Sequence, residues 1–536
     1  MKTSPFFSPL TVALAVGVLT CLGTAGRARA ATFHVATAQE LQTTLFTAQA
    51  NGQDDTIYFA AGIYSGQFTF NSTEAQSLTM LTETNAPVGQ VVVSGNMSLS
   101  AGNAPSITVR GITFKNGSPG LAVGTSGTIS LVGCVFQACS GGFATTGNCA
   151  FSCSGSLMTG NSGRAGYLVG CRSVFLGHNT VQGNVGGVVM DGGVSSYRYA
   201  MTGPVTVVGN RFVGGGTQLD IYNNGATVVS NNVFKGNTSG AMSASSDSGN
   251  SGSVVSVNNQ FVQNSGGNTA SCGARSVVFQ GNTFRGNSMG GSGNTCIAYL
   301  NGVAYLNCAN NLFVSNSVPY GRGAIWVQPG VTNWVANNTV CGNVGNGMTL
   351  LPGTWTHIHN NILWGNSGVD VIVGTGGSLR SLYNNDYHSI SGLVDLAVNN
   401  IDVDPLFVDA PGGDYHLRAN SGCINAGLNY STNGSPALPL IDKDGNVRIA
   451  DGIVDIGAYE QARADQHPAD TDTNWVMSVA EFTAYATAWT NRAAWATGPN
   501  PIPIDYVTRA GYLAGTNSGA YHNEGGGKPR NWKPGF

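Results

Sequence analysis

A short pattern of an asparagine followed two residues later by an apolar residue recurs about every 22 to 31 residues between about residues 110 and 390. Each unit reads Asn-x-apolar-x-x-Asn and leads into a Gly-rich turn. Strong self-similarity at such a period predicts stacked structural repeats. The first Asn and its apolar partner are Asn210 with Phe212, Asn232 with Phe234, Asn259 with Phe261, Asn282 with Phe284, Asn311 with Phe313, Asn338 with Val340 and Asn361 with Leu363; the second Asn is Asn237, Asn264, Asn287, Asn316, Asn343 or Asn366.

Between the asparagines, short alternations of apolar and polar residues predict β-strands bounded by turns. Examples are residues 205–208, 254–257 and 325–327, and helical periodicity is nearly absent. An Asn at one place in successive coils can hydrogen-bond the amides above and below it, which satisfies a buried polar side chain. The Phe two residues later is expected to stack inside the coil.

These features predict an all-β chain, a right-handed, single-stranded parallel β-helix of about twelve coils. The right hand follows from the general handedness of parallel crossover connections. The repeated strand, Asn and Phe pattern resembles the β-helices of the pectin-lyase-like superfold. At roughly 4.8 Å per coil, the rod would be about 55 to 60 Å long, and we expect it to be monomeric.

The segment before the repeats predicts a capping helix for the rod. Thr37 and Glu40 form a capping-box pattern, and Leu41, Leu45 and Phe46 follow at helical spacing over residues 38–50. A helix there would cover the open apolar end of the first coil, as in many bacterial β-helix proteins, and would protect an exposed sheet edge.

Residues 1–30 have the layout of a secretory signal, with Lys2, an apolar stretch over 10–22 and cleavage before Ala31. No later run is long enough to predict a transmembrane segment. Without the signal, 20 basic and 26 acidic residues leave a formal net charge of −6, so nucleic acid is not an expected partner. Only 9% of residues are charged, which favours neutral glycans or proteins as ligands. We predict a secreted or bacterial cell-surface location.

Five ordered motifs between residues 400 and 461 form a second recognisable segment. They resemble the choice-of-anchor Q domain, a resemblance which implies that residues 400–461 close the β-helix of residues 31–399. Asp442, Asp444 and Asn446 lie in a tight Asp/Gly loop and could hold Ca²⁺, although a structural turn is the preferred interpretation. The motifs are 400-NIDVDPLFVD-409, 413-GDYHL-417, 425-NAG-427, 442-DKDGNVR-448 and 455-DIGAYE-460.

The C-terminal residues 462–536 open with a candidate calcium loop. Its oxygen-bearing residues occupy positions 1, 3, 5, 7, 9 and 12 of such a loop, and an amphipathic helix follows. The loop resembles EF-hand and dockerin-type modules, except that Trp475 stands where Gly is usual. The alternative is a polar loop that only caps the helix. The predicted Ca²⁺ ligands are Asp470, Asp472, Asn474, the Val476 carbonyl, Ser478 and Glu481.

Catalytic signatures of the superfold's polygalacturonases are absent from the coils. A lyase would need a Lys or Arg base next to carboxylates that hold Ca²⁺, yet residues 101–400 contain no Glu and only six Asp. One set of charged residues on neighbouring coils could support lyase chemistry, with Arg as base and Asp orienting a sugar or cation. A surface ladder of ion pairs is the preferred interpretation. The set is Arg164, Asp191, Arg198 and Asp220.

Other residues with chemical potential have simpler interpretations. Cys272 and Cys296 are separated by about one coil, which suggests a disulfide. His357 and His359 share one strand face and are expected to face solvent rather than bind a metal. Four tryptophans could form an aromatic strip for sugar rings, or could be buried singly. They are Trp326, Trp334, Trp355 and Trp364.

Taken together, these features favour a β-helix for display, adhesion or binding of a polysaccharide or surface protein. The alternative is an extracellular polysaccharide lyase or glycoside hydrolase. A third hypothesis is a component docked through the calcium module, which would need a cohesin-like partner. Enzymatic activity is left open by the sequence.

Overall fold

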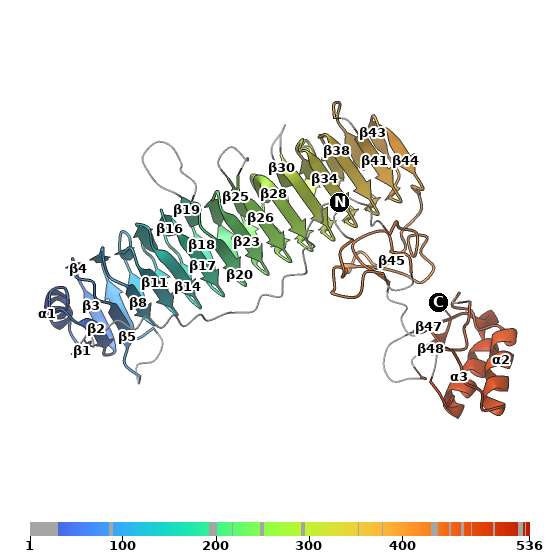
Figure 1. Cartoon of the computed structure of the whole chain (residues 1–536), viewed down its shortest axis with the longest axis horizontal. Helices are drawn as coiled ribbons and strands as arrows, with labels where there is room; N and C mark the ends of the chain where they lie inside the picture. Colours follow the sequence, from blue (N-terminus) through green and yellow to red (C-terminus); the bar gives the residue numbers. More distant parts are fainter. Residues whose placement is uncertain are drawn as a thin grey trace, which may run out of the picture.

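A computed structural model describes the chain from residue 30 onward, and its strands wind into a long parallel β-rod (Figure 1). The predicted signal falls within residues 1–29, outside the described residues. The described ranges are 30–84, 89–191, 201–216, 218–246, 251–290, 295–351, 353–377, 379–429, 438–449, 452–461, 466–472, 474–496, 499–523, 529–530 and 532–535.

Each coil contributes three strands, and equivalent strands of successive coils pair in parallel to form three columns. The first column contains β1 (Ala30–Val35), β2 (Asp54–Phe59), β5 (Leu78–Thr82), β8 (Ser106–Arg110), β11 (Thr128–Val132), β14 (Ala150–Ser154), β17 (Ser173–Gly177), β20 (Val205–Val208), β23 (Ala226–Ser230), β26 (Ser253–Val257), β34 (Thr332–Ala336), β38 (Trp355–His359), β41 (Leu379–Tyr383) and β44 (Leu396–Val398).

The second column is an independent sheet of 14 strands. It contains β3 (Gly62–Ser65), β6 (Val91–Ser94), β9 (Thr113–Lys115), β12 (Val135–Gln137), β15 (Leu157–Thr159), β18 (Thr180–Asn184), β21 (Arg211–Gly215), β24 (Val233–Asn237), β27 (Gln260–Val262), β29 (Thr283–Arg285), β31 (Leu312–Val314), β35 (Thr339–Cys341), β39 (Ile362–Trp364) and β42 (Asp386–Tyr387).

The third column joins the first through two long strands, β28 (Ala270–Gln280) and β30 (Cys296–Ala309), which belong to both. A short pair, β32 (Ser317–Val318) and β36 (Val344–Gly345), lies beside the rod. The remaining strands of the third column are β4 (Phe68–Ser72), β7 (Met97–Ala101), β10 (Leu121–Gly124), β13 (Phe143–Thr146), β16 (Arg164–Val169), β19 (Gly186–Asp191), β22 (Leu219–Tyr222), β25 (Met242–Ser245), β33 (Gly323–Val327), β37 (Met348–Leu350), β40 (Val371–Val373) and β43 (Ile390–Gly392).

The rod has about fifteen turns, so the predicted count of about twelve coils was too low. The first coils, built from β1 to β8, lie before residue 110 and lack the Asn-x-Phe unit from which the coils were counted. They fold into the same stack because alternating apolar residues such as Val91, Val93, Met97 and Leu99 still fill the interior.

Two ladders of buried asparagine run along the rod, as predicted. Asn259 shows the repeating geometry: its Nδ2 donates to Asn282 Oδ1 at 3.0 Å and to the Val229 carbonyl at 2.8 Å. The first ladder begins with Ser156 and continues through Asn179, Asn210, Asn232, Asn259, Asn282, Asn311, Asn338, Asn361, Asn385 and Asn400. The second includes Asn237, Asn264, Asn287, Asn316, Asn343 and Asn366.

Phenylalanines between the ladders stack inside the rod, which confirms a second sequence prediction. The rings of Phe212, Phe234, Phe261, Phe284 and Phe313 lie 4.4 to 4.8 Å apart between neighbouring centroids and are nearly parallel. All five are fully buried in one continuous core. Each coil therefore depends on the coils on both sides of it for its core contacts.

Helix α1 (Ala38–Ala48) lies at the N-terminal end of the rod. The predicted capping box is present, since Thr37 Oγ1 accepts from Glu40 N and the Glu40 carboxylate accepts from Thr37 N. Leu41 and Leu45 are buried in the main core cluster. A role for this helix as a cover of the first coil stays a prediction.

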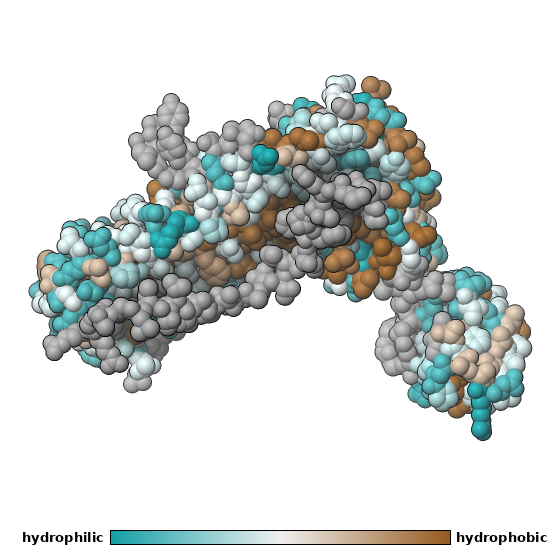
Figure 2. All heavy atoms as spheres, in the orientation of Figure 1, coloured by the Kyte–Doolittle hydropathy of each residue, from teal (hydrophilic) through white to brown (hydrophobic). Residues whose placement is uncertain are grey.

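The segment 401–460, with β45 (Phe407–Asp409) and β46 (Asp414–Leu417), packs against the flank of the coils. Asn337 Nδ2 donates to the Asp455 carbonyl, and Gly457 N donates to the Asn360 carbonyl. Leu428 and Leu438 lie on Trp334 of the first column. In the same column, Figure 2 shows apolar side chains gathered over β23, β26 and β28, where the outward residues Val228, Val255 and Val278 share one register.

The C-terminal described residues form a small unit with its own apolar core (Figure 1). It contains α2 (Val479–Thr490), α3 (Ile504–Ala514), a 3-10 turn η2 (Asn517–Gly519), and the antiparallel pair β47 (Tyr521–Asn523) and β48 (Trp532–Pro534). Its core includes Met477, Tyr485, Leu513, Tyr521 and Trp532.

Candidate binding surfaces and the acidic loop

Two of the charged residues proposed for lyase chemistry, Arg164 and Asp191, lie at opposite ends of their paired strands. Arg164 opens β16 and pairs with Gly186, whereas Asp191 ends β19 and pairs with Val169. These positions are five residues apart, about 16 Å along the strands. Arg198 lies outside the described residues.

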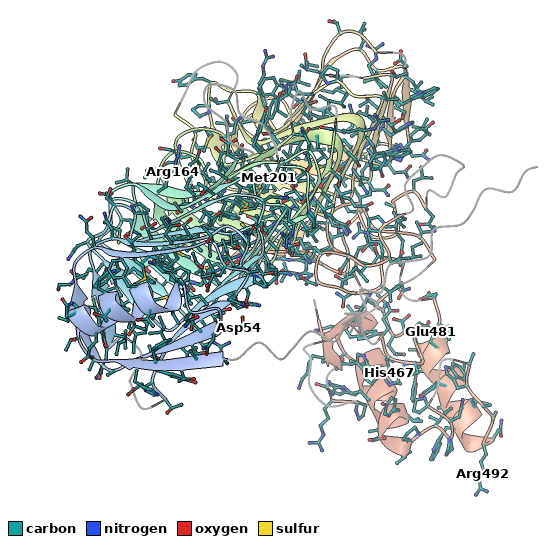
Figure 3. The ribbon with its side chains drawn as sticks, turned by 60° about the vertical axis from the view of Figure 1, so that its left-hand side comes forward. Asp54, Arg164, Met201, His467, Glu481 and Arg492 are labelled. Atoms are coloured by element: carbon teal, nitrogen blue, oxygen red, sulfur yellow. The ribbon has the colours of Figure 1, made fainter. Side chains whose placement is uncertain are left out.

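Asp220 lies closer to the middle of this face, in register with Val189. The guanidinium of Arg164, labelled in Figure 3, lies 4.5 Å from the centroid of the Tyr167 ring and forms a cation–π contact. Arg164 is therefore held against an aromatic ring by its own strand, which is a different arrangement from a base that faces paired carboxylates.

A continuous row of outward-facing side chains runs along the third column over seven coils. Six steps at roughly 4.8 Å make the row about 29 Å long. Its members occupy consecutive paired registers and are half-buried except for the last, which is 7% exposed. We call it the Tyr167–Trp326 row: Tyr167, Val189, Asp220, Ser243, Ser271, Tyr299 and Trp326.

Both ends of the Tyr167–Trp326 row carry an arginine on an aromatic ring. At the far end, the Arg322 guanidinium lies 5.4 Å from the Trp326 ring, and Tyr299 meets Trp326 edge-on at 5.1 Å. Trp326 Nε1 is buried without a hydrogen-bond partner in the described part of the chain. Aromatic faces, hydroxyls, a carboxylate and cations suit a polyhydroxylated ligand. The sequence signal that could have found this row is the Arg three or four residues before an aromatic residue.

The four tryptophans do not form an exposed strip, and the alternative that they are buried singly holds for most of them. Trp326 and Trp334 are 7% and 5% exposed, and Trp364 packs under segment 401–460. Only Trp355, among these four, is well exposed, at 46%. Segment 401–460 packs on Trp334 and Trp364, whereas Trp326 is contacted by Tyr299 and Arg322. The spacing of the tryptophans in the sequence does not reveal these contacts.

The prediction that His357 and His359 face solvent is also wrong. His357 stacks on Trp334 at 4.1 Å, and His359 contacts Trp334 and Tyr383 edge-on. His359 is 4% exposed, and its burial lowers its pKa to about 3. The neutral His359 imidazole therefore packs between aromatic rings and contributes to the apolar packing of this face.

The acidic loop of the C-terminal unit brings three predicted metal ligands together. Carboxylate oxygens of Asp470, Asp472 and Glu481 all lie within 4.8 Å of one another. Asn474 connects to this group, since its Nδ2 donates to Asp472 Oδ2 at 2.9 Å. Figure 3 places Glu481 at the start of α2.

The carboxylate of Glu481 also holds the loop closed by itself. Its Oε1 accepts from the backbone N–H groups of Thr471 and Asp472, and its Oε2 accepts from Ser478. Burial acts to raise the pKa of Glu481, but these hydrogen bonds outweigh it and the pKa is lowered. The capping box from Ser478 to Glu481 is therefore present, as the structural alternative to calcium required.

Trp475 shows how the loop turns without the usual glycine. Its φ is +60°, in the left-handed region that glycine adopts most easily. Its ring packs 5.3 Å from Tyr521, and its carbonyl accepts from Tyr521 N. Val476 forms an isolated antiparallel bridge with Ala520, which lies between η2 and β47.

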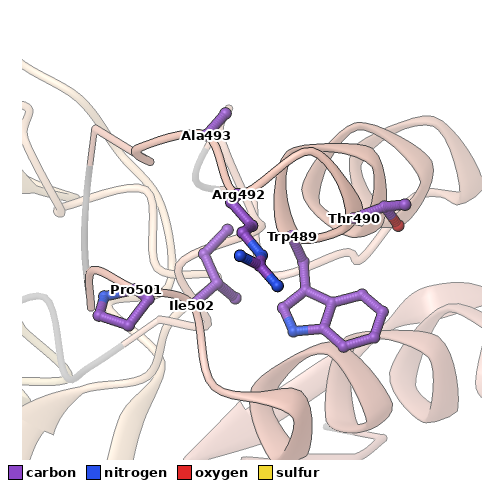
Figure 4. A pocket seen from close by; sticks show the side chains of 6 residues that line it. All are labelled: Trp489, Thr490, Arg492, Ala493, Pro501 and Ile502. Carbon is purple, nitrogen blue, oxygen red and sulfur yellow. The ribbon is translucent and has the colours of Figure 1, made fainter.

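A shallow pocket of about 440 Å³ lies at the other end of α2 (Figure 4). The Arg492 guanidinium lies between Ile502 and the Trp489 indole, and Trp489 is 39% exposed. The remaining lining residues are Thr490, Ala493 and Pro501. The site combines an aromatic face with one cation and was not found from the sequence.

The predicted bridge between Cys272 and Cys296 does not fit the observed register. Strands β28 and β30 pair Ala270 with Ala298 and Cys272 with Leu300, a step of 28 residues. Cys272 therefore lies four positions along the strand from the level of Cys296. The coil at this point is longer than the spacing of 24 that suggested the bridge.

Fold and repeat together define a right-handed parallel β-helix repeat protein. Residues 97–251 match a family model described as "Right handed beta helix region". No curated protein matched the chain in sequence. No helix in the described part of the chain is long and apolar enough to cross a membrane.

Several solved structures are similar in fold at low sequence identity. One is a PL6 family polysaccharide lyase from Pseudopedobacter saltans, with a TM-score of 0.29, 15% identity and coverage of 72% of this chain and 96% of that one. A pectate lyase has a TM-score of 0.26, 11% identity and coverage of 81% and 97%. A Streptococcus pneumoniae surface protein and adhesin has a TM-score of 0.24, 13% identity and coverage of 67% and 95%.

Proposed function

We propose that this chain is a secreted or cell-surface β-helix protein that binds a glycan along the Tyr167–Trp326 row. The observation that carries this proposal is the row itself, in which the half-buried rings of Tyr167 and Tyr299 lie on either side of hydroxyl groups, and the buried Trp326 supports Tyr299 edge-on. An extended sugar chain offers apolar ring faces to the aromatic residues and hydroxyl groups to Ser243, Ser271 and Asp220. A surface protein is the alternative ligand.

Binding is favoured over lyase chemistry by the placement of the charged side chains. A lyase needs its base and its carboxylates at one reacting carbon. Here Arg164 and Asp191 are separated by five strand positions, and Arg164 is engaged by Tyr167. The lyase alternative makes a distinct prediction, which is release of an unsaturated product that absorbs in the ultraviolet.

We expect Tyr167→Ala and Tyr299→Ala each to weaken glycan binding by about 1 kcal/mol, or roughly fivefold, because each removes one stacking ring. The measurement is a glycan-array screen followed by calorimetry on the best ligand, with product absorbance recorded in parallel. Tyr58→Ala is the matched control, since Tyr58 stacks on His34 on the first column. Equal affinity in all three variants would disprove the row as the site, and product formation would support the lyase alternative.

We also propose that the C-terminal loop holds Ca²⁺ through Asp470, Asp472, Asn474, the Val476 carbonyl, Ser478 and Glu481. Hard oxygen ligands at this spacing suit Ca²⁺. The left-handed Trp475 and the clustered carboxylates support the proposal. A bound ion would neutralise the repulsion between these carboxylates and would tie the loop to helix α2.

We expect Ca²⁺ at 100 times its dissociation constant to stabilise the C-terminal unit by about 2.7 kcal/mol, while the rod is unchanged. Hydrogen exchange of peptides from 466–523, with Ca²⁺ and with a chelator, measures this directly. Asp472→Ala should abolish the shift at little structural cost because Asp472 is exposed. Asp505→Asn, an exposed acid on α3, is the control. Terbium luminescence sensitised by Trp475 gives an independent readout, and its absence would contradict the site.

A further inference from the structure

Cys149 and Cys171 occupy equivalent turns of two neighbouring coils. Cys149 lies between β13 and β14, and Cys171 lies between β16 and β17. Their sulfur atoms are 3.3 Å apart. Arg172 N donates to the Cys149 carbonyl at 2.8 Å, so the two turns are stacked by the backbone as well.

This contact distinguishes the pair from the other cysteines. Ten cysteines are described, all of them buried. The sulfurs of Cys134, Cys153 and Cys423 contact carbonyl, amide or carboxylate oxygens. No other two of these ten have sulfur atoms in contact. The distance, and not the number of cysteines, therefore selects Cys149 and Cys171.

The surroundings shift the pKa values of the two thiols in opposite directions, so that Cys149 is the better nucleophile. The Cys171 thiol donates toward Cys149, and with Thr145 and the nearby Arg172 it lowers the pKa of Cys149 to about 7 against the effect of burial. The same contact with Cys149, together with burial, raises the pKa of Cys171. Arg172 is fixed beside the pair because its Nη1 donates to the Asn148 carbonyl. Thiolate character at Cys149 is what disulfide exchange requires.

The pair lies where the first asparagine ladder is weakest. In this part of the rod the ladder positions hold Cys134 and Ser156 in place of asparagine. Ser156 Oγ accepts from Cys134 N, but it cannot also make the amide contacts that each Asn of the later coils makes to the next coil. A covalent link between neighbouring turns would hold the register that the ladder holds elsewhere.

We propose that Cys149 and Cys171 form a disulfide between coils in the mature protein. The Cys149 thiolate attacks a sulfur of an oxidant disulfide, such as oxidised glutathione or the disulfide of a protein oxidoreductase, and one oxidant thiolate leaves. Cys171 then loses its proton and attacks the Cys149 sulfur, and the second oxidant thiolate leaves. Two protein thiols are oxidised and one oxidant disulfide is reduced to two thiols. The sulfurs approach from 3.3 Å to ~2.05 Å.

The sequence allows this bond to be mapped directly. Trypsin cuts after Lys115, Arg164 and Arg172, so Cys171 is the one cysteine of the peptide 165–172, while Cys149 lies in 116–164. The full chain is folded with reduced and oxidised glutathione, its remaining thiols are alkylated in denaturant, and the unreduced digest is analysed by mass spectrometry. We expect peptide 165–172 joined to 116–164 through Cys149, with Cys134, Cys139 and Cys153 alkylated.

Two other results would overturn the proposal. One is peptide 165–172 alkylated at Cys171, which shows a free thiol; the other is a bond from Cys171 to Cys134, Cys139 or Cys153. Cys149→Ser should release peptide 165–172 in alkylated form, whereas the control Cys153→Ser should leave it joined. The wild-type map decides the question even if a variant fails to fold.

Discussion

Asn259→Ala is expected to destabilise the coils around it by about 4 kcal/mol. The Asn259 side chain is fully buried and accepts from both Asn232 N and Asn232 Nδ2 at 3.0 Å. Its removal leaves the buried Asn232 N–H without an acceptor and the Val229 carbonyl without its 2.8 Å donor. Each buried unsatisfied group costs about 1–3 kcal/mol, and the loss of side-chain contacts adds to that cost.

The damage should be local because coils interact with their neighbours along the stack. Hydrogen exchange should accelerate in β20 to β29, while peptides from β2 to β8 remain protected. Asn258→Gly is the control: Asn258 is exposed, with φ +55°, which glycine adopts without strain. Equal protection in the Asn259 and Asn258 variants would show that the ladder contributes little.

The C-terminal unit is expected to lose about 3 kcal/mol of stability as the pH falls from 6.5 to about 4, because of His467. This imidazole is fully buried, and burial lowers its pKa to about 4. Its Nδ1 accepts from Ala469 N, so Nε2 carries the hydrogen and donates to the Tyr506 carbonyl. Protonation would place a second hydrogen opposite the Ala469 N–H, near the positive Arg509.

The direction follows from proton linkage. The unfolded chain binds a proton on His467 near pH 6.5, whereas the folded unit does not until about pH 4. The contribution of the neutral His467 to the free energy of unfolding is therefore complete above pH 6.5 and is lost as the pH falls toward 4. Glu481, whose folded pKa is lowered, loses its contribution only below its ordinary value of 4.5, so the window from 4.5 to 6.5 isolates the histidine.

Hydrogen exchange at several pH values, corrected for intrinsic rates, measures this loss in peptides from 466–496. The exposed His388 supplies the control, since His388→Gln should leave the pH dependence of these peptides unchanged. Constant protection between pH 7 and 4.5 would refute the role of His467. Rod peptides from β20 to β29 provide an internal reference because no histidine lies in that stretch.

The interior of the rod could be predicted because most coils bury the same residue types at the same positions. Asn at one position and an apolar residue, often Phe, at another are buried in successive coils from about residue 210 onward, so their spacing predicts both ladders and the ring stack. The number of coils was underestimated because the first coils use residues such as Val91 and Leu99 without the Asn-x-Phe unit. Apolar alternation alone was too weak a signal to count them.

The candidate binding row and the covered flank could not be predicted, because both depend on which coils lie side by side. Loops of different length change the spacing between Tyr167, Asp220 and Tyr299, although the three share one register. Trp334 is buried by Leu428 and Leu438, about 100 positions later in the chain. Such contacts leave no periodic trace in the sequence.

The sequence by itself determined the parallel β-helix, its asparagine ladders, its stacked phenylalanines and the capping box at Thr37, since these arise from repeated or local interactions. The tertiary structure alone decided the separation of Arg164 from Asp191, the contact between Cys149 and Cys171, and the pairing of the acidic loop with residues after α3. The physical reason is that inter-coil register depends on the exact length of every turn, and a shift of a few residues moves a side chain by 10 Å or more, at roughly 3.3 Å per residue.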